Sequence, residues 1–157
     1  MKTLILGIGN PILQDDGVGI QVVEKVRQVL NDPSVDIDIA FTGGLNLLDH
    51  LKGYDKAVLV DAVRSKTEQL GMVQRFLLSE RDVVHASNPH DVSLSEALVL
   101  AKKLGEQHLP KEIIIIGVVI NSQHEFGEDL SREIQQAIPR AVKMVVAEIH
   151  ETERKSI

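Results

Sequence analysis

Apolar residues recur along this chain with two periods, one typical of strands and one typical of helices. Continuous or alternating apolar runs predict five strands, at residues 4–8, 35–39, 56–60, 71–78 and 113–120. Apolar residues three or four positions apart predict helices at residues 17–30, 45–51, 93–104 and 130–149. Because the two kinds of segment alternate, we expect a single α/β domain over residues 1–157. It would have three layers, α/β/α, with a mostly parallel, twisted sheet of about five strands and helices on both faces.

Local signals refine three of these segments. Residues 35–39 alternate apolar and acidic side chains, which is typical of a strand with one face in water, near a sheet edge. The β-branched run at 113–120 instead suits a strand that is covered on both faces. Pro139 falls inside the last helical segment, so we expect it either to kink that helix or to begin its second half.

The stretch from Gly7 to Gly19 joins the first strand to the first helix and contains two adjacent carboxylates. Its glycines let backbone or a ligand approach closely, because they have no Cβ. Asp15 and Asp16 stand where the unpaired N–H groups of the helix favour negative charge. An Asp at this place is usually an N-cap, but one helix needs only one cap. The second carboxylate is therefore a candidate for a functional site.

Several common sites do not fit the sequence. A dinucleotide fingerprint beginning at Gly7 and Gly9 would need its third glycine at position 12, which is Ile12, and Pro11 interrupts the turn. Two carboxylates would also lie where a pyrophosphate should meet the helix. The chain has no G-x-x-x-x-G-K phosphate loop, no H-E-x-x-H zinc helix and no G-x-S-x-G nucleophile elbow.

Composition narrows the class further. The chain has 157 residues, the size of one ordinary domain, and 43% are hydrophobic, as in a globular protein. A net charge of −6 weighs against nucleic acid as a partner. No apolar run approaches the length that crosses a membrane, so we expect no membrane partner. The absence of cysteine excludes disulfides, a thiolate nucleophile and a cysteine-based zinc site, and with no evident leader we expect a cytoplasmic protein.

Three polar residues are expected at the carboxyl ends of the parallel strands, where ligands of such sheets gather. Asp16 follows the first strand, Asp61 ends the strand at 56–60, and His90 lies in a proline-containing loop before a helix. Two carboxylates and one imidazole suit a divalent metal and leave positions open for water or substrate. Alternatively, Asp61 only terminates its strand and His90 is a surface histidine, with His85 as its rival for the site.

The order of these motifs resembles the hydrogenase maturation protease family. The resemblance rests on the Gly7–Gly19 stretch, on Asp61 and on the loop around His90, and it extends over essentially the whole chain. It implies an endopeptidase that removes a C-terminal extension from the large subunit of a [NiFe] hydrogenase after nickel insertion. It also implies that Asp16, Asp61 and His90 are the catalytic and metal-contacting residues. The nickel would belong to the precursor, which is the expected protein partner, and no organic cofactor is expected.

Some questions stay open at this point. Some members of the family have Glu where this chain has Asp16, so Asp15 is an alternative ligand. Nickel would serve either as a Lewis acid that polarises the scissile carbonyl or only as a recognition anchor, and we favour the anchor. A non-catalytic metal-binding or metal-chaperone module using the same Asp16, Asp61 and His90 is the alternative function.

Overall fold

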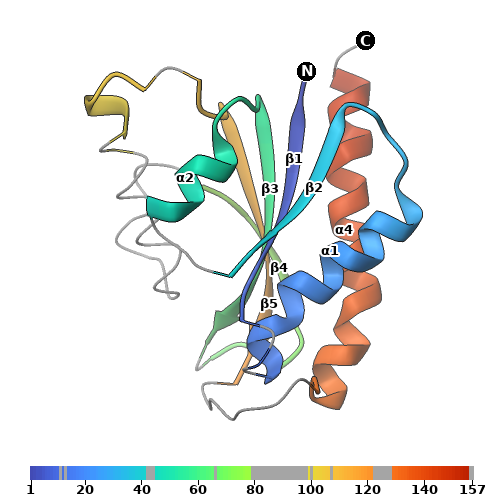
Figure 1. Cartoon of the computed structure of the whole chain (residues 1–157). Helices are drawn as coiled ribbons and strands as arrows, with labels where there is room; N and C mark the ends of the chain where they lie inside the picture. The colour runs from blue at the N-terminus through green and yellow to red at the C-terminus, as the bar shows by residue number, and fades with distance from the viewer. Residues whose placement is uncertain are drawn as a thin grey trace.

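The computed structural model describes residues 1–10, 12, 14–41, 45–65, 67–78, 99, 101–106, 108–121 and 129–155. Its elements are shown in Figure 1. In chain order they are β1 (Thr3–Ile8), the 3₁₀ turn η1 (Gln14–Gly17), α1 (Val18–Val29), β2 (Val35–Ala40), α2 (Leu45–Leu51), β3 (Lys56–Arg64), β4 (Val73–Leu77), β5 (Glu112–Ile120) and α4 (Arg132–Lys155). Of the helix expected at 93–104, residues 99 and 101–104 are described; residues 99 and 101–103 are helical, and Leu104 lies in a turn.

The sheet confirms the expected fold class. Its five strands lie in the order β2-β1-β3-β5-β4, in which the first four are parallel and β4 runs antiparallel to β5. The acidic, alternating strand β2 lies at one edge, as its pattern predicts. Strand β5 lies inside the sheet and is buried from Ile113 to Ile120, as expected for a strand that is covered on both faces.

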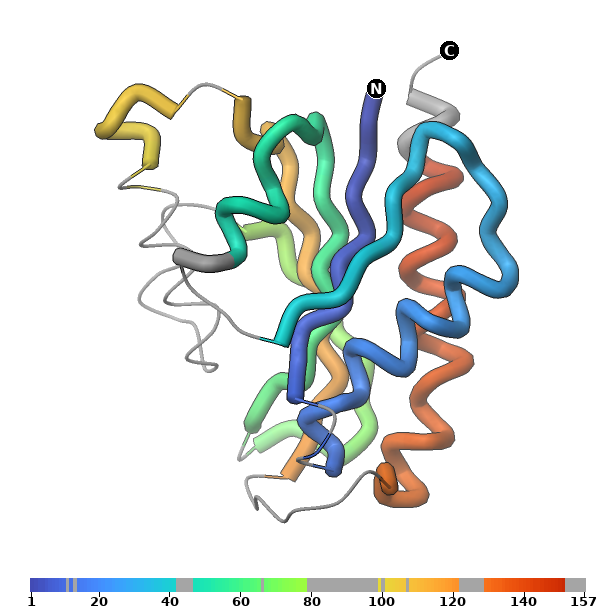
Figure 2. The backbone as a smooth tube through the Cα atoms, viewed as in Figure 1, coloured from blue at the N-terminus to red at the C-terminus, as the bar shows by residue number. Residues whose placement is uncertain are grey.

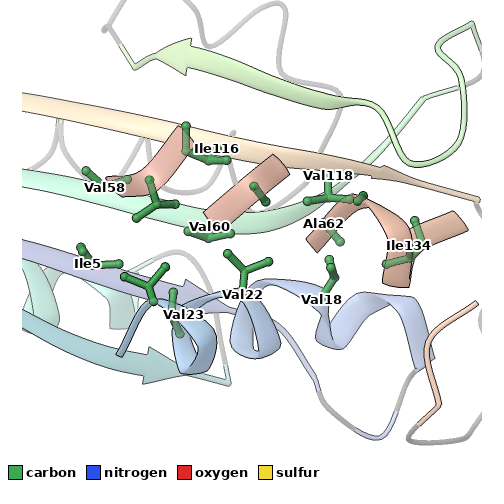
Figure 3. Close-up of a cluster of buried hydrophobic side chains, with 14 of the residues drawn as sticks. Ile5, Val18, Val22, Val23, Val58, Val60, Ala62, Ile116, Val118 and Ile134 are labelled. Atoms are coloured by element: carbon green, nitrogen blue, oxygen red, sulfur yellow. The ribbon is translucent and has the colours of Figure 1, made fainter. Parts of the chain in front are cut away.

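Helices cover both faces of the sheet. Helices α1 and α4 lie side by side over one face, and α2 lies over the other (Figures 1 and 2). Alternation along β3 divides its side chains between the two layers: Val58, Val60 and Ala62 join the core under α1 and α4, which Figure 3 shows, whereas Ala57 and Leu59 pack on the α2 side. No helix among the described residues has the length and hydropathy needed to cross a bilayer.

One expectation about an element end is corrected. Strand β3 does not stop at Val60 but continues to Arg64, so Asp61 lies inside the strand and does not end it. The extension exists because β5 keeps pairing with β3 as far as Arg64, while β1 pairs with it only as far as Val60.

Pro139 lies inside the single helix α4, which runs from Arg132 to Lys155. Buried apolar residues on both sides of the proline hold that helix against the core.

A buried ion network fastens α4 to the amino ends of the strands. The Lys56 ammonium lies 3.4 Å from a carboxylate oxygen of Glu148 and also 3.4 Å from one of Glu112. Arg75 of β4 donates hydrogen bonds to the same Glu148 carboxylate. Burial by itself raises the pKa of Glu148, but the hydrogen bond and charge of Arg75 and the charge of Lys56 outweigh it and hold that pKa below its ordinary value of 4.5.

We expect Glu148→Gln to lower the free energy of unfolding at pH 7 by about 3 kcal/mol, because it leaves the buried Lys56 without its main counter-charge. A carboxyl group with a depressed pKa in the folded protein stabilises the fold above its unfolded pKa. That contribution is lost as the pH falls below about 4.5. The difference between the wild type and the variant, measured by urea unfolding, should therefore shrink in acid.

Glu112→Gln is the matched control. It removes a carboxylate at the same distance from Lys56, but from a side chain that is 39% exposed. Its cost should stay below about 1 kcal/mol. Equal losses in the two variants would mean that burial of Glu148 adds nothing to the network.

Candidate active site

The connections of the sheet define where a ligand should bind. From β1 the chain passes through α1 to β2 on one side, whereas from β3 it continues to β4 and then to β5, which both lie on the other side of β3. In open α/β sheets, ligands bind beyond the carboxyl ends of the strands at the point where neighbouring connections run in opposite directions. Here that point lies between the carboxyl ends of β1 and β3, at the lower edge of the sheet in Figure 1.

Close backbone packing brings η1 and the start of α1 to this point. A Cβ on Gly19 would lie 2.3 Å from the carbonyl oxygen of Val60 and 2.6 Å from that of Ile8. A Cβ on Gly9 would lie 2.1 Å from the carbonyl oxygen of Asp16. Real Cβ atoms do not approach oxygen so closely, so only glycine allows the turn to reach both strands.

Asp16 is held at this position by polar contacts on both of its carboxylate oxygens. The side chain is buried, and its Oδ2 accepts a hydrogen bond of 2.9 Å from the N–H of Asn10. Its Oδ1 lies 3.7 Å from the guanidinium of Arg64 at the end of β3. The N-cap of α1 is Gly17, with no side-chain capping bond, so the expectation that one of the two aspartates caps this helix is wrong.

Asp15 has a structural role that the sequence did not reveal. Its two oxygens accept hydrogen bonds from the backbone N–H and the hydroxyl of Ser131, at 2.7 and 2.8 Å. Ser131 immediately precedes α4, so Asp15 ties η1 to the start of that helix. Both oxygens of Asp15 thus accept hydrogen bonds from Ser131, whereas Asp16 accepts one hydrogen bond and makes a longer ionic contact of 3.7 Å with Arg64.

Asp61 lies on the neighbouring strand, at the first position of β3 beyond its pairing with β1. It is 1% exposed, and its Oδ1 accepts a hydrogen bond of 2.8 Å from the N–H of Ala62. Alternation places its side chain on the α2 face of β3, together with Leu59. Asp16 and Asp61 are thus two buried carboxylates at the same edge of the sheet.

The third predicted residue, His90, lies outside the described residues, as does its rival His85. Asp16 and Asp61 therefore supply two of the three predicted ligands. No group of three His, Cys, Asp or Glu side chains suited to a metal occurs within the part of the chain that the structure describes. Arg64 was missed because the sequence assigned it to a polar loop. The continuing apolar residues Ala62 and Val63 were the available signal that the strand is longer.

Comparison with known proteins identifies the family. The family model HycI, hydrogenase maturation protease, matches residues 20–148 of this chain. Hydrogenase 2 maturation protease of Escherichia coli (strain K12) is 28% identical over 158 residues, covering 97% of this chain and 93% of that protein. The delta subunit of coenzyme F420 hydrogenase from Methanothermobacter thermautotrophicus is 29% identical, with 94% of each chain covered.

Solved structures agree with this result. The hydrogenase maturating endopeptidase HybD from E. coli superposes with a TM-score of 0.81 at 28% identity, over 97% of this chain and 94% of that one. The [NiFe] hydrogenase maturation protease HybD from Thermococcus kodakarensis gives a TM-score of 0.71 at 25% identity, over 94% of this chain and 98% of that one. The chain therefore belongs to the hydrogenase maturation protease family and is an endopeptidase.

Proposed function

We propose that this protein is a nickel-dependent endopeptidase that removes the C-terminal extension from the nickel-loaded precursor of a [NiFe] hydrogenase large subunit. The observation that carries the proposal is the pair of buried carboxylates, Asp16 in η1 and Asp61 at the first position of β3 beyond its pairing with β1. The name of the T. kodakarensis protease refers to [NiFe] hydrogenase, and that protein shares the fold over nearly the whole of this chain. We also propose that it acts in the cytoplasm, since the chain has no cysteine and needs no oxidising compartment.

In this proposal Asp16, Asp61 and His90 contact nickel that the precursor carries as part of the substrate. Carboxylate and imidazole groups are suitable ligands for such an ion. Burying a carboxylate is costly unless an opposite charge or hydrogen bonds compensate for the lost hydration. Asp61, at 1% exposure, and Asp16, at 7%, are both buried and each accepts a hydrogen bond, and in this proposal the cation is a further partner for them.

Hydrolysis of the scissile peptide bond requires an activated water molecule and a proton for the departing amine. A carboxylate within hydrogen-bonding reach of the water accepts its proton as the oxygen attacks the carbonyl carbon. When the C–N bond breaks, the same proton is delivered to the amine. Asp16 and Asp61 are the candidates for this base, and we propose that nickel anchors the precursor so that the scissile bond lies beside them.

The first test is a processing assay with the large-subunit precursor from the same source, prepared with and without nickel. We expect intact-mass measurement to show loss of a C-terminal peptide only from the nickel-loaded precursor, because contact with the metal positions the substrate. Cleavage without nickel would contradict the nickel dependence. A stable complex with no cleavage of a verified nickel-loaded precursor would instead favour a non-catalytic metal-binding module.

The second test replaces the site residues one at a time. We expect Asp16→Asn, Asp61→Asn and His90→Ala each to lower the processing rate by about a hundredfold or more, because each removes a ligand or the base. The asparagine variants keep an oxygen for the N–H groups of Asn10 and Ala62, so circular dichroism should show the wild-type fold.

Asp15→Asn is the matched control for Asp16→Asn, since it makes the same change one residue earlier. It weakens the contact with Ser131 and should cost about 1 kcal/mol of stability, but it should leave most of the processing rate. Loss of processing in Asp15→Asn with retention in Asp16→Asn would exchange the roles that we assign to the two aspartates.

A further inference from the structure

Arg64 is placed beside the candidate site by the extension of β3. It is the last residue of the strand, where it pairs with Ile120 of β5. Alternation puts its side chain on the same face of β3 as Val60 and Ala62, and η1 contacts both β3 and α1. The side chain is only 24% exposed, so its positive charge is partly shielded from water.

The contact between Arg64 and Asp16 gives the site a cation of its own. One oxygen of Asp16 accepts the N–H of Asn10, and the other lies 3.7 Å from the guanidinium. The guanidinium of arginine carries a delocalised positive charge. Any cation that reaches Asp16 must therefore approach a fixed positive charge at close range.

We infer that Arg64 is a specificity-determining residue that keeps uncomplexed divalent cations away from Asp16. A hydrated nickel ion has a charge of +2, and repulsion from the guanidinium lowers its affinity for the carboxylate. Nickel held by a precursor has a smaller net charge, because the protein groups that bind it are deprotonated and in part anionic. Arg64 thus disfavours the bare ion more strongly than the loaded precursor, and this inference rests on the proposed role of Asp16 as a nickel contact.

Removal of the charge should therefore strengthen the binding of nickel alone. Isothermal titration calorimetry with nickel chloride, in the absence of any precursor, compares the wild type with Arg64→Gln. We expect Arg64→Gln to bind nickel at least about tenfold more tightly, since the repulsion acts at a distance of a few ångströms in a partly buried site. Arg64→Lys restores a positive charge and should bind nickel nearly as weakly as the wild type.

Arg27→Gln is the matched control because it makes the same change in net charge. Arg27 lies in the last turn of α1, about 15 Å along the helix from Gly17, and contacts Glu24 on the surface. The affinity of the Arg27→Gln variant for nickel should stay within about twofold of the wild-type affinity. An equal gain in Arg27→Gln and Arg64→Gln would attribute the effect to net charge and overturn the inference.

The double variant Arg64→Gln/Asp16→Asn locates the effect. The gain in nickel affinity should disappear when Asp16 is neutralised, and a gain that persists overturns the inference. If Arg64→Gln melts early by circular dichroism, Arg64→Met serves in its place. Unchanged affinity in the folded variant refutes the role of Arg64 even where the wild type processes its precursor. Conversely, a tenfold gain supports that role even where the wild type fails to cleave.

Discussion

Contact between backbone atoms at the carboxyl end of the sheet is the constraint on which the site depends. Gly19 lies against the carbonyl oxygens of Ile8 and Val60, so the first turn of α1 sits directly on the end of β1 and on β3 at Val60. Any side chain at this position would push the helix and η1 outward, and Asp16 with them. The glycine therefore sets the position of Asp16 without contributing a functional group itself.

Much of the fold was predictable from the sequence because periodicity reports burial directly. The alternation in β2 and the apolar run in β5 fixed their places at the edge and in the interior of the sheet. The end of β3 was placed too early, since Asp61 interrupts the apolar run and resembles a strand terminus, although Ala62 and Val63 continue that run. Pairing with β5, a contact between distant segments, carries the strand past it.

The candidate site was predictable in composition but not in its contacts. Asp16 and Asp61 were expected at the same edge because parallel strands end together; Asp16 lies in η1 and Asp61 inside β3, and the joint role of these two residues with His90 stays a prediction. Asp15 and Asp16 have different partners, because Asp15 contacts Ser131 and Asp16 contacts Arg64. Both partners lie far away in the sequence. Adjacent identical side chains give no local sign of such partners.

The hydrogen bonds between Asp15 and Ser131 make two positions that are distant in the sequence depend on each other. The two residues are 116 positions apart, yet their side chains join η1 to the start of α4 through a matched acceptor and donor pair. Replacement of Ser131 by a residue without a hydroxyl leaves Asp15 with one donor fewer, and replacement of Asp15 leaves the serine hydroxyl without that acceptor. A substitution at one position should therefore be accompanied by a compensating substitution at the other, so that the two positions change together in related sequences.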